Sequence, residues 1–201
     1  MWLAFQPKIC VLSGQPVELK ALIRGRHPQR GELSPALFVP LTEQAGLTSA
    51  LTAWVTDSVI TRLSRLRKSC ILLPVTINIS CGDFARKGVV DSLEKRFVEA
   101  KLPTSLLGIG CLEIDRILES PAALQGLEMF KQHGFAIFLD NFNIDYISTS
   151  HLQRLPQGMI RLDRMLTSEI FSDTASRIIT QSISAMLREL DCTTLLKTWT
   201  R

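Results

Sequence analysis

The sequence lacks any apolar run near the roughly 18 residues that a membrane-spanning helix needs. It also lacks a basic and apolar leader, because Phe5-Gln6-Pro7 already has the character of a folded domain. No low-complexity stretch or linker interrupts the 201 residues, of which 46% are hydrophobic and 21% charged. We therefore expect one globular domain, residues 1–201, in the cytoplasm and without a membrane partner.

Signatures of zinc sites and disulfide frameworks are absent as well. The cysteines are odd in number, form no Cys-x-x-Cys motif and stand beside no pair of histidines: Cys10, Cys70, Cys81, Cys111 and Cys192. This pattern predicts buried, reduced thiols, since a free cysteine packs as a small hydrophobic side chain.

The sequence also has little that is typical of nucleic-acid binding. Its net charge is only +4, and its one dense basic cluster, over residues 62–68, contains no aromatic side chains. Cations near a helix end are favoured by the helix dipole, so we expect a solvated helix terminus and no direct nucleic-acid partner.

What the sequence does contain is an alternation of strand-type and helix-type segments. Apolar and β-branched runs predict strands over residues 5–11, 16–23, 74–80, 106–114, 135–140, 159–163 and 193–196. Helical spacing and capping signals predict helices that begin at 35 and span 51–66, 89–100, 122–133 and 175–190, with a polar loop over 24–32. Such alternation favours an α/β fold with a largely parallel sheet covered by helices.

Polar side chains recur where the predicted parallel strands end. These residues are Asn78, Glu113, Asp140 and Asp163. In a (β/α) barrel the carboxyl ends of the strands meet at one mouth, which is where such barrels carry their chemistry. We therefore expect these four side chains to lie close together.

Short motifs in a fixed order give the chain its resemblance to a known family. They are Phe5-Gln6-Pro7, Lys20-Ala21-Leu22-Ile23-Arg24, Phe38-Val39-Pro40-Leu41, Glu43-Gln44-Ala45-Gly46-Leu47, Asn78-Ile79-Ser80, Leu112-Glu113-Ile114 and Leu162-Asp163-Arg164. In this order they resemble the EAL domains, the bacterial cyclic-di-GMP phosphodiesterases. The resemblance implies a TIM-like (β/α) barrel of the EAL type, shortened at its C-terminal end to about seven strands because the sequence ends at Arg201.

The resemblance also implies several departures at the catalytic positions. In the family a pair of divalent metal ions is held by carboxylates and an asparagine. Here the family's signature glutamate, second aspartate, catalytic lysine and two late glutamates are replaced, at Lys20, Asn141, Arg161, Lys197 and Thr200. We therefore expect a degenerate domain that is not an enzyme, with no metal, no cofactor and no catalytic residue. Asn78, Glu113, Asp140 and Asp163 would remain as a vestigial acidic cluster, with Lys20 paired to Glu113 and Asp140.

Two functions follow from the resemblance and stay open at this point. The first is regulation by protein–protein binding, since stand-alone degenerate members regulate motility and some bind the flagellar master activator FlhDC. The loop after Asp140 has lost the family's glycines, and its candidate partner-binding residues are Ile144, Tyr146 and Ile147. The alternative is a cyclic-di-GMP receptor that does not hydrolyse its ligand, with candidate nucleotide-binding residues Gln6, Lys20, Arg24 and Arg161.

Overall fold

The computed structural model describes residues 1–10, 13–142 and 159–195, and its centre is one twisted β-sheet. The strands are β1 (Trp2–Ile9), β2 (Pro16–His27), β3 (Gly31–Leu33), β4 (Val75–Ile79), β5 (Leu107–Cys111), β6 (Ala136–Phe142), β7 (Met159–Leu162) and β8 (Thr193–Leu195). They follow the order β1-β2-β4-β5-β6-β7-β8, and β3 pairs only with β2. Seven strands thus form a single path within the described residues.

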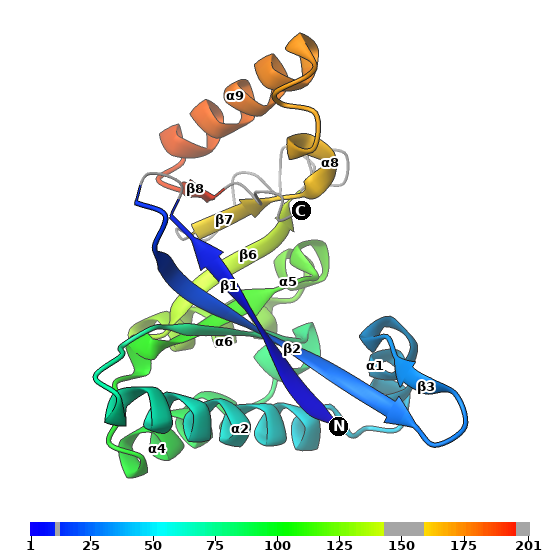
Figure 1. The fold of residues 1–201 in the computed structure, drawn as a ribbon, viewed down its shortest axis with the longest axis vertical. Coiled ribbons are helices and arrows are strands. Elements are labelled where there is room, and N and C mark those ends of the chain that lie inside the picture. Colours follow the sequence, from blue (N-terminus) through cyan, green and yellow to red (C-terminus); the bar gives the residue numbers. More distant parts are fainter. Residues whose placement is uncertain (11–12, 143–158, 196–201) are drawn as a thin grey trace.

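Strand direction gives the sheet the geometry of a (β/α) barrel. β1 is antiparallel to β2, while every neighbouring pair from β2 to β8 along the path is parallel. Within the described residues, helical crossovers join β2 to β4, β4 to β5, β5 to β6 and β7 to β8, and Figure 1 shows them outside the curved sheet. The predicted α/β barrel with about seven strands is therefore confirmed.

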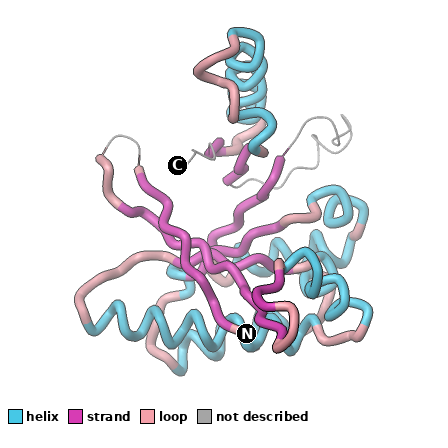
Figure 2. The backbone as a smooth tube through the Cα atoms, turned by 45° about the vertical axis from the view of Figure 1, so that its right-hand side comes forward, coloured by secondary structure: helices cyan, strands magenta, loops and turns pink. Residues whose placement is uncertain are grey.

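Helices cover the outside of this sheet. They are α1 (Pro35–Gln44), α2 (Thr48–Lys68), α3 (Cys81–Phe84), α4 (Val89–Glu99), α5 (Ile114–Glu119), α6 (Pro121–Gln132), α8 (Arg164–Thr167) and α9 (Thr174–Glu189), with a short 3-10 turn, η1 (Thr104–Leu106). Figure 2 shows α2 and α4 beside the strands at one end of the molecule and α9 at the other. α9 packs against α8 and β8.

The core lies between the sheet and α3, α4 and α6. Four phenylalanines, from α3, α4, α6 and the position before β6, form a chain of edge-to-face contacts, with ring centroids 5.4–6.2 Å apart: Phe84, Phe97, Phe130 and Phe135. All four are at most 3% exposed. β5 is buried along its whole length, and β4 is buried except at Asn78, so both strands are covered on both faces.

Three local predictions are wrong. Residues 24–27 do not open a polar loop but continue β2, because main-chain pairing of Gly25 to Leu33 and of His27 to Gly31 forms a small hairpin with β3. The strand predicted over 106–114 ends at Cys111, and Glu113 precedes α5. Among the cysteines, Cys70 is exposed, since it lies in the left-handed turn after α2.

Within the described part of the chain, no helix combines the length and the hydropathy needed to cross a membrane.

Candidate mouth of the barrel

The candidate site is built on the inner face of β2. Glu18 and Lys20 are two residues apart, so their side chains leave the strand on the same face. On the antiparallel strand β1, Lys8 lies opposite Glu18 and Gln6 lies opposite Lys20. The sequence pointed to Lys20 and Gln6 but not to Glu18 and Lys8. Glu18 lies two residues from Lys20, and Lys8 lies two residues from Gln6, so each pair shares one face of its strand.

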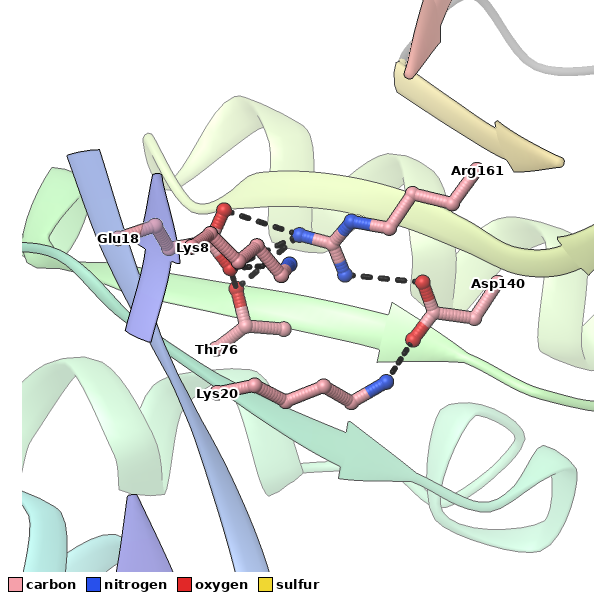
Figure 3. A network of polar contacts seen from close by, with 6 residues as sticks. All are labelled: Lys8, Glu18, Lys20, Thr76, Asp140 and Arg161. Atoms are coloured by element: carbon pink, nitrogen blue, oxygen red, sulfur yellow. Dashed lines mark hydrogen bonds and ion pairs between the residues drawn. The ribbon is translucent and has the colours of Figure 1, made fainter. Parts of the chain in front are cut away.

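Arg161, on β7, joins the two carboxylates of this site (Figure 3). Its Nη1 donates to Oδ1 of Asp140 at 2.8 Å, and its Nη2 donates to the Glu18 carboxylate at 2.8 and 3.0 Å. Lys20 donates to the other oxygen of Asp140, Oδ2. The side chains of Asp140 and Arg161 are at most 3% exposed, so this is a buried ion-pair network.

Lys8 and Thr76 complete the network. The Nζ of Lys8 donates to Oε1 of Glu18 at 2.7 Å, and the Thr76 hydroxyl donates to the same carboxylate. Every carboxylate oxygen of Glu18 and Asp140 therefore accepts a hydrogen bond. A buried charge is tolerated only when it is paired and hydrogen-bonded in this way.

Two glycines on β5 provide the space for these side chains. A Cβ added at Gly108 would lie 2.4 Å from the Thr76 hydroxyl oxygen, and one added at Gly110 would lie 2.7 Å from Oδ1 of Asn78. The same added atom at Gly110 would lie 3.1 Å from Oδ2 of Asp140. The absence of side chains at these two positions of β5 thus allows polar groups from β4 and β6 to approach one another across it.

The network shifts the pKa values of two of its members. Burial opposes ionisation of Asp140, but the ammonium of Lys20 and the guanidinium of Arg161 together hold the pKa of that carboxyl below its usual value. Burial also lowers the pKa of Lys8 from 10.5 to about 8, although its hydrogen bond to Glu18 acts in the opposite direction.

The network carries more positive than negative charge. Among the described residues, Lys8, Lys20 and Arg161 face two carboxylates, those of Glu18 and Asp140. The guanidinium of Arg161 also lies over the ring of Phe138, with its Cζ 3.7 Å from the ring centroid. Its Nε is buried and finds no hydrogen-bond partner in the part of the chain that the structure describes.

The structure brings only part of the predicted acidic and amide set together within the described residues. Asn78 and Asp140 meet beside Gly110, where an added Cβ would lie 2.7 Å from Oδ1 of the first and 3.1 Å from Oδ2 of the second. Asp140 belongs to the network, whereas Glu113 binds Arg116 and accepts from the backbone N–H of Cys81 at 3.2 Å. The prediction that Lys20 pairs with Asp140 is therefore confirmed, and the prediction that it pairs with Glu113 is wrong. Asn78 is exposed at the end of β4, and half-buried Asp163 follows β7.

The remaining predicted residues are either at the mouth or outside the described residues. Gln6 is exposed, and half-buried Arg24 donates to the carbonyl of Ile23 at 2.9 Å and lies 3.8 Å from Glu32. The side chain of Asn141 is not described, and the other predicted positions lie outside the described residues altogether: Ile144, Tyr146, Ile147, Lys197 and Thr200.

These residues do not fit the pair of divalent metals that the resemblance implies. Both oxygens of Asp140 face a cation, and Glu18 is held by Arg161 and Lys8. Among the described residues, no three histidine, cysteine, aspartate or glutamate side chains gather as metal ligands. Like unit charges 4 Å apart repel by about 4 kcal/mol at an effective dielectric constant of 20, and a divalent ion doubles this near Lys20.

A pocket of about 430 Å³ opens beside the mouth. Its walls come from α1, α2 and the β2 residues Ala21, Leu22 and Ile23, and they are mainly apolar. Asn78, Glu113 and Glu43 add polar groups to this lining. Apolar walls with a few polar groups are typical of a pocket for a small planar ligand.

The comparison with protein families decides the classification, because the EAL domain model matches residues 1–197. The chain belongs to the EAL family. Over 190 residues it is 30% identical to MucR of Pseudomonas aeruginosa, a bifunctional diguanylate cyclase/cyclic di-GMP phosphodiesterase, and 94% of the chain is covered. Over 187 residues it is 29% identical to the cyclic di-GMP phosphodiesterase PdeR of Escherichia coli, with 93% covered.

The likeness extends to a solved EAL structure. The phosphodiesterase of MucR in complex with cyclic di-GMP superimposes with a TM-score of 0.85 at 28% identity, covering 99% of this chain and 81% of that one. In sequence, by contrast, the chain spans only 28% of the length of MucR and of PdeR.

The EAL relatives overturn the expectation that this chain is not an enzyme. MucR and PdeR are named as phosphodiesterases, and each aligns with more than nine-tenths of the chain. The expectation rested on the residue types at single positions such as 20, 141 and 161. A replaced ligand at one position does not by itself show that the fold has lost its activity.

Proposed function

We propose that the mouth of this EAL domain binds cyclic di-GMP. The observation that carries the proposal is the excess positive charge of the Lys8–Glu18–Arg161–Asp140–Lys20 network. Cyclic di-GMP carries two phosphodiester anions, which a cationic site attracts through charge-assisted hydrogen bonds. MucR and PdeR are named as cyclic di-GMP phosphodiesterases, and the superimposed structure is a complex with the same nucleotide, which supports the proposal.

The neighbouring pocket suits the other part of such a ligand. A guanine base presents a planar apolar face and an edge with N–H donors. The apolar walls from β2 and α1 would take the face, and a carboxylate such as Glu43 or Glu113 would accept from the edge. Arg24 and Gln6, at half-buried and exposed positions of β2 and β1, are the further contacts that we propose.

A calorimetric titration of cyclic di-GMP into the full chain tests this function. We expect micromolar or tighter binding, and we expect Arg24→Ala to weaken it tenfold or more because a charge-assisted hydrogen bond contributes about 1.5–3 kcal/mol. Arg65→Ala is the matched control, since Arg65 is exposed in the C-terminal half of α2. Chromatography of the nucleotide after each titration shows whether its phosphodiester has been opened. The absence of heat at high ligand concentration would refute the proposal.

A second candidate function, binding to a protein partner, is favoured by exposed apolar side chains around α9. Phe171 is 96% exposed, and Ile178 and Ile179 are about half exposed. A groove lined by Phe171 also includes the cations Arg177 and Arg188. We propose a partner with an apolar surface edged by acidic side chains, and the flagellar activator FlhDC remains the partner expected from the resemblance.

A further inference from the structure

Lys20 is the more exposed of the two cations that pair with the buried carboxylate of Asp140. Its side chain is 12% exposed, whereas the side chain of Arg161 is 3% exposed and that of Asp140 is 0% exposed. Among the described residues its ammonium has one hydrogen-bond partner, Asp140, although an ammonium has three donors. Two donors of Lys20 are thus available to a ligand that reaches the network from the mouth.

We propose that Lys20 takes the place of a divalent cation in this mouth, so that a phosphodiester group is bound by Lys20 without a metal ion. The inference rests on the proposed binding of cyclic di-GMP and adds the means by which the phosphate is held. Asp140 then acts as a positioning residue, because it fixes the ammonium at the mouth and is itself fixed by Arg161 from the other side.

The charges around Lys20 favour an anion and disfavour a second cation. Arg161, Lys20 and Lys8 outnumber the carboxylates of Glu18 and Asp140, and no described residue provides an acceptor for the buried Nε of Arg161. A phosphate oxygen beside Lys20 would balance the excess charge. A metal ion at the same place would have to displace Lys20 from Asp140 and would meet the guanidinium of Arg161 behind it.

The first test is titration of cyclic di-GMP in the presence of a chelator and, in parallel, with Mg²⁺, Mn²⁺ or Ca²⁺. We expect the same dissociation constant within about twofold in all four conditions. The inference would be overturned if binding required a divalent ion, or if a divalent ion lowered the dissociation constant tenfold. The same native chain is used in every condition, so a difference in affinity cannot come from a variant that fails to fold.

Three variants test the role assigned to Lys20. In chelator, Lys20→Met should weaken binding at least tenfold and Lys20→Arg should retain it within a few fold, because arginine keeps the charge. Lys95→Met, at a lysine that is 77% exposed on α4, is the matched control and should leave binding unchanged. Unchanged affinity in Lys20→Met would overturn the inference. Circular dichroism of each variant shows whether it has folded.

Metal titration without nucleotide separates this inference from the proposed function. We expect Mn²⁺ to leave the melting temperature of the native chain unchanged and to raise that of Lys20→Glu, in which a third carboxylate would join Glu18 and Asp140. If cyclic di-GMP fails to bind under any condition, the proposed function fails. An unchanged native melting temperature would then still support the replacement of the metal by Lys20, whereas a rise would overturn it.

Discussion

At the scale of the residue, Lys8 shows how burial and pairing compete within the site. Its ammonium is held by Glu18 at 2.7 Å and lies 5.3 Å from the centroid of the Phe138 ring, yet burial dominates and lowers its pKa to about 8. In the unfolded chain the pKa is near its ordinary value of 10.5. Between these two values the unfolded state binds more protons than the folded state, so the free energy of unfolding must rise with pH there.

Substitution of Lys8 tests this linkage. The cost of burying the charged ammonium is fully present below pH 8 and is relieved as the pH rises from about 8 to 10.5. Lys8→Met should therefore reduce the increase in unfolding free energy over that range, as measured by urea unfolding at several pH values. Lys95→Met should not change it, because Lys95 is largely exposed. Equal pH slopes for the native chain and Lys8→Met would contradict the prediction.

At the scale of the element, the contact between α3 and α6 depends on one glycine. A Cβ added at Gly126 would lie 1.9 Å from the carbonyl oxygen of Phe84 and 2.8 Å from its carbonyl carbon. These are main-chain atoms, so the clash cannot be relieved by a change of rotamer. The two helices would have to move apart, and with them the contact between Phe84 and Phe130.

Gly126→Ala should therefore destabilise the domain despite the higher helix propensity of alanine. Overpacking typically costs about 1–3 kcal/mol, and for a chain of this size each kcal/mol lowers the melting temperature by about 2–4 °C. The control is Gly82→Ala on α3, where an added Cβ would meet only the Ser80 hydroxyl, at 3.9 Å. A thermal melt in which both variants behave alike would show that the close approach is not needed.

The elements also show what could and could not be predicted from the sequence. Strands such as β4 and helices such as α9 have strong periodicity, and their predicted bounds lie within one or two residues of the structure. β3 and the end of β2 were missed because Gly25–Leu33 pairing depends on a partner strand rather than on local apolar pattern. In the site, the Lys20–Asp140 pair was predicted from the family resemblance together with the opposite charges of the two side chains. Glu18 was missed because the family pattern was compared one position at a time, without regard to the strand face.

At the scale of the whole molecule, the proposed nucleotide site and the proposed protein-binding surface lie on different elements. The charged side chains of the mouth come from β1, β2, β6 and β7. α9 lies at the far end of the sheet path, and among the described elements its main contacts are with α8 and β8 (Figures 1 and 2). A ligand at the mouth and a protein at α9 would therefore not compete for the same side chains. Each proposal can fail without the other.

The protein-binding surface is tested by placing a charge in it. Ile178, on α9, is 55% exposed, and burying such a side chain against a partner would contribute about 1.5–3 kcal/mol. If purified FlhDC is the partner, it should co-elute with the native chain in size-exclusion chromatography. Ile178→Glu should weaken that complex at least tenfold, because a carboxylate would then have to be desolvated in the interface.

Val98→Glu is the matched control, since Val98 is a similarly exposed β-branched residue on α4 and should leave co-elution unchanged. If Ile178→Glu binds as well as the native chain, α9 is not the docking surface, and if the native chain does not co-elute, FlhDC is not its partner.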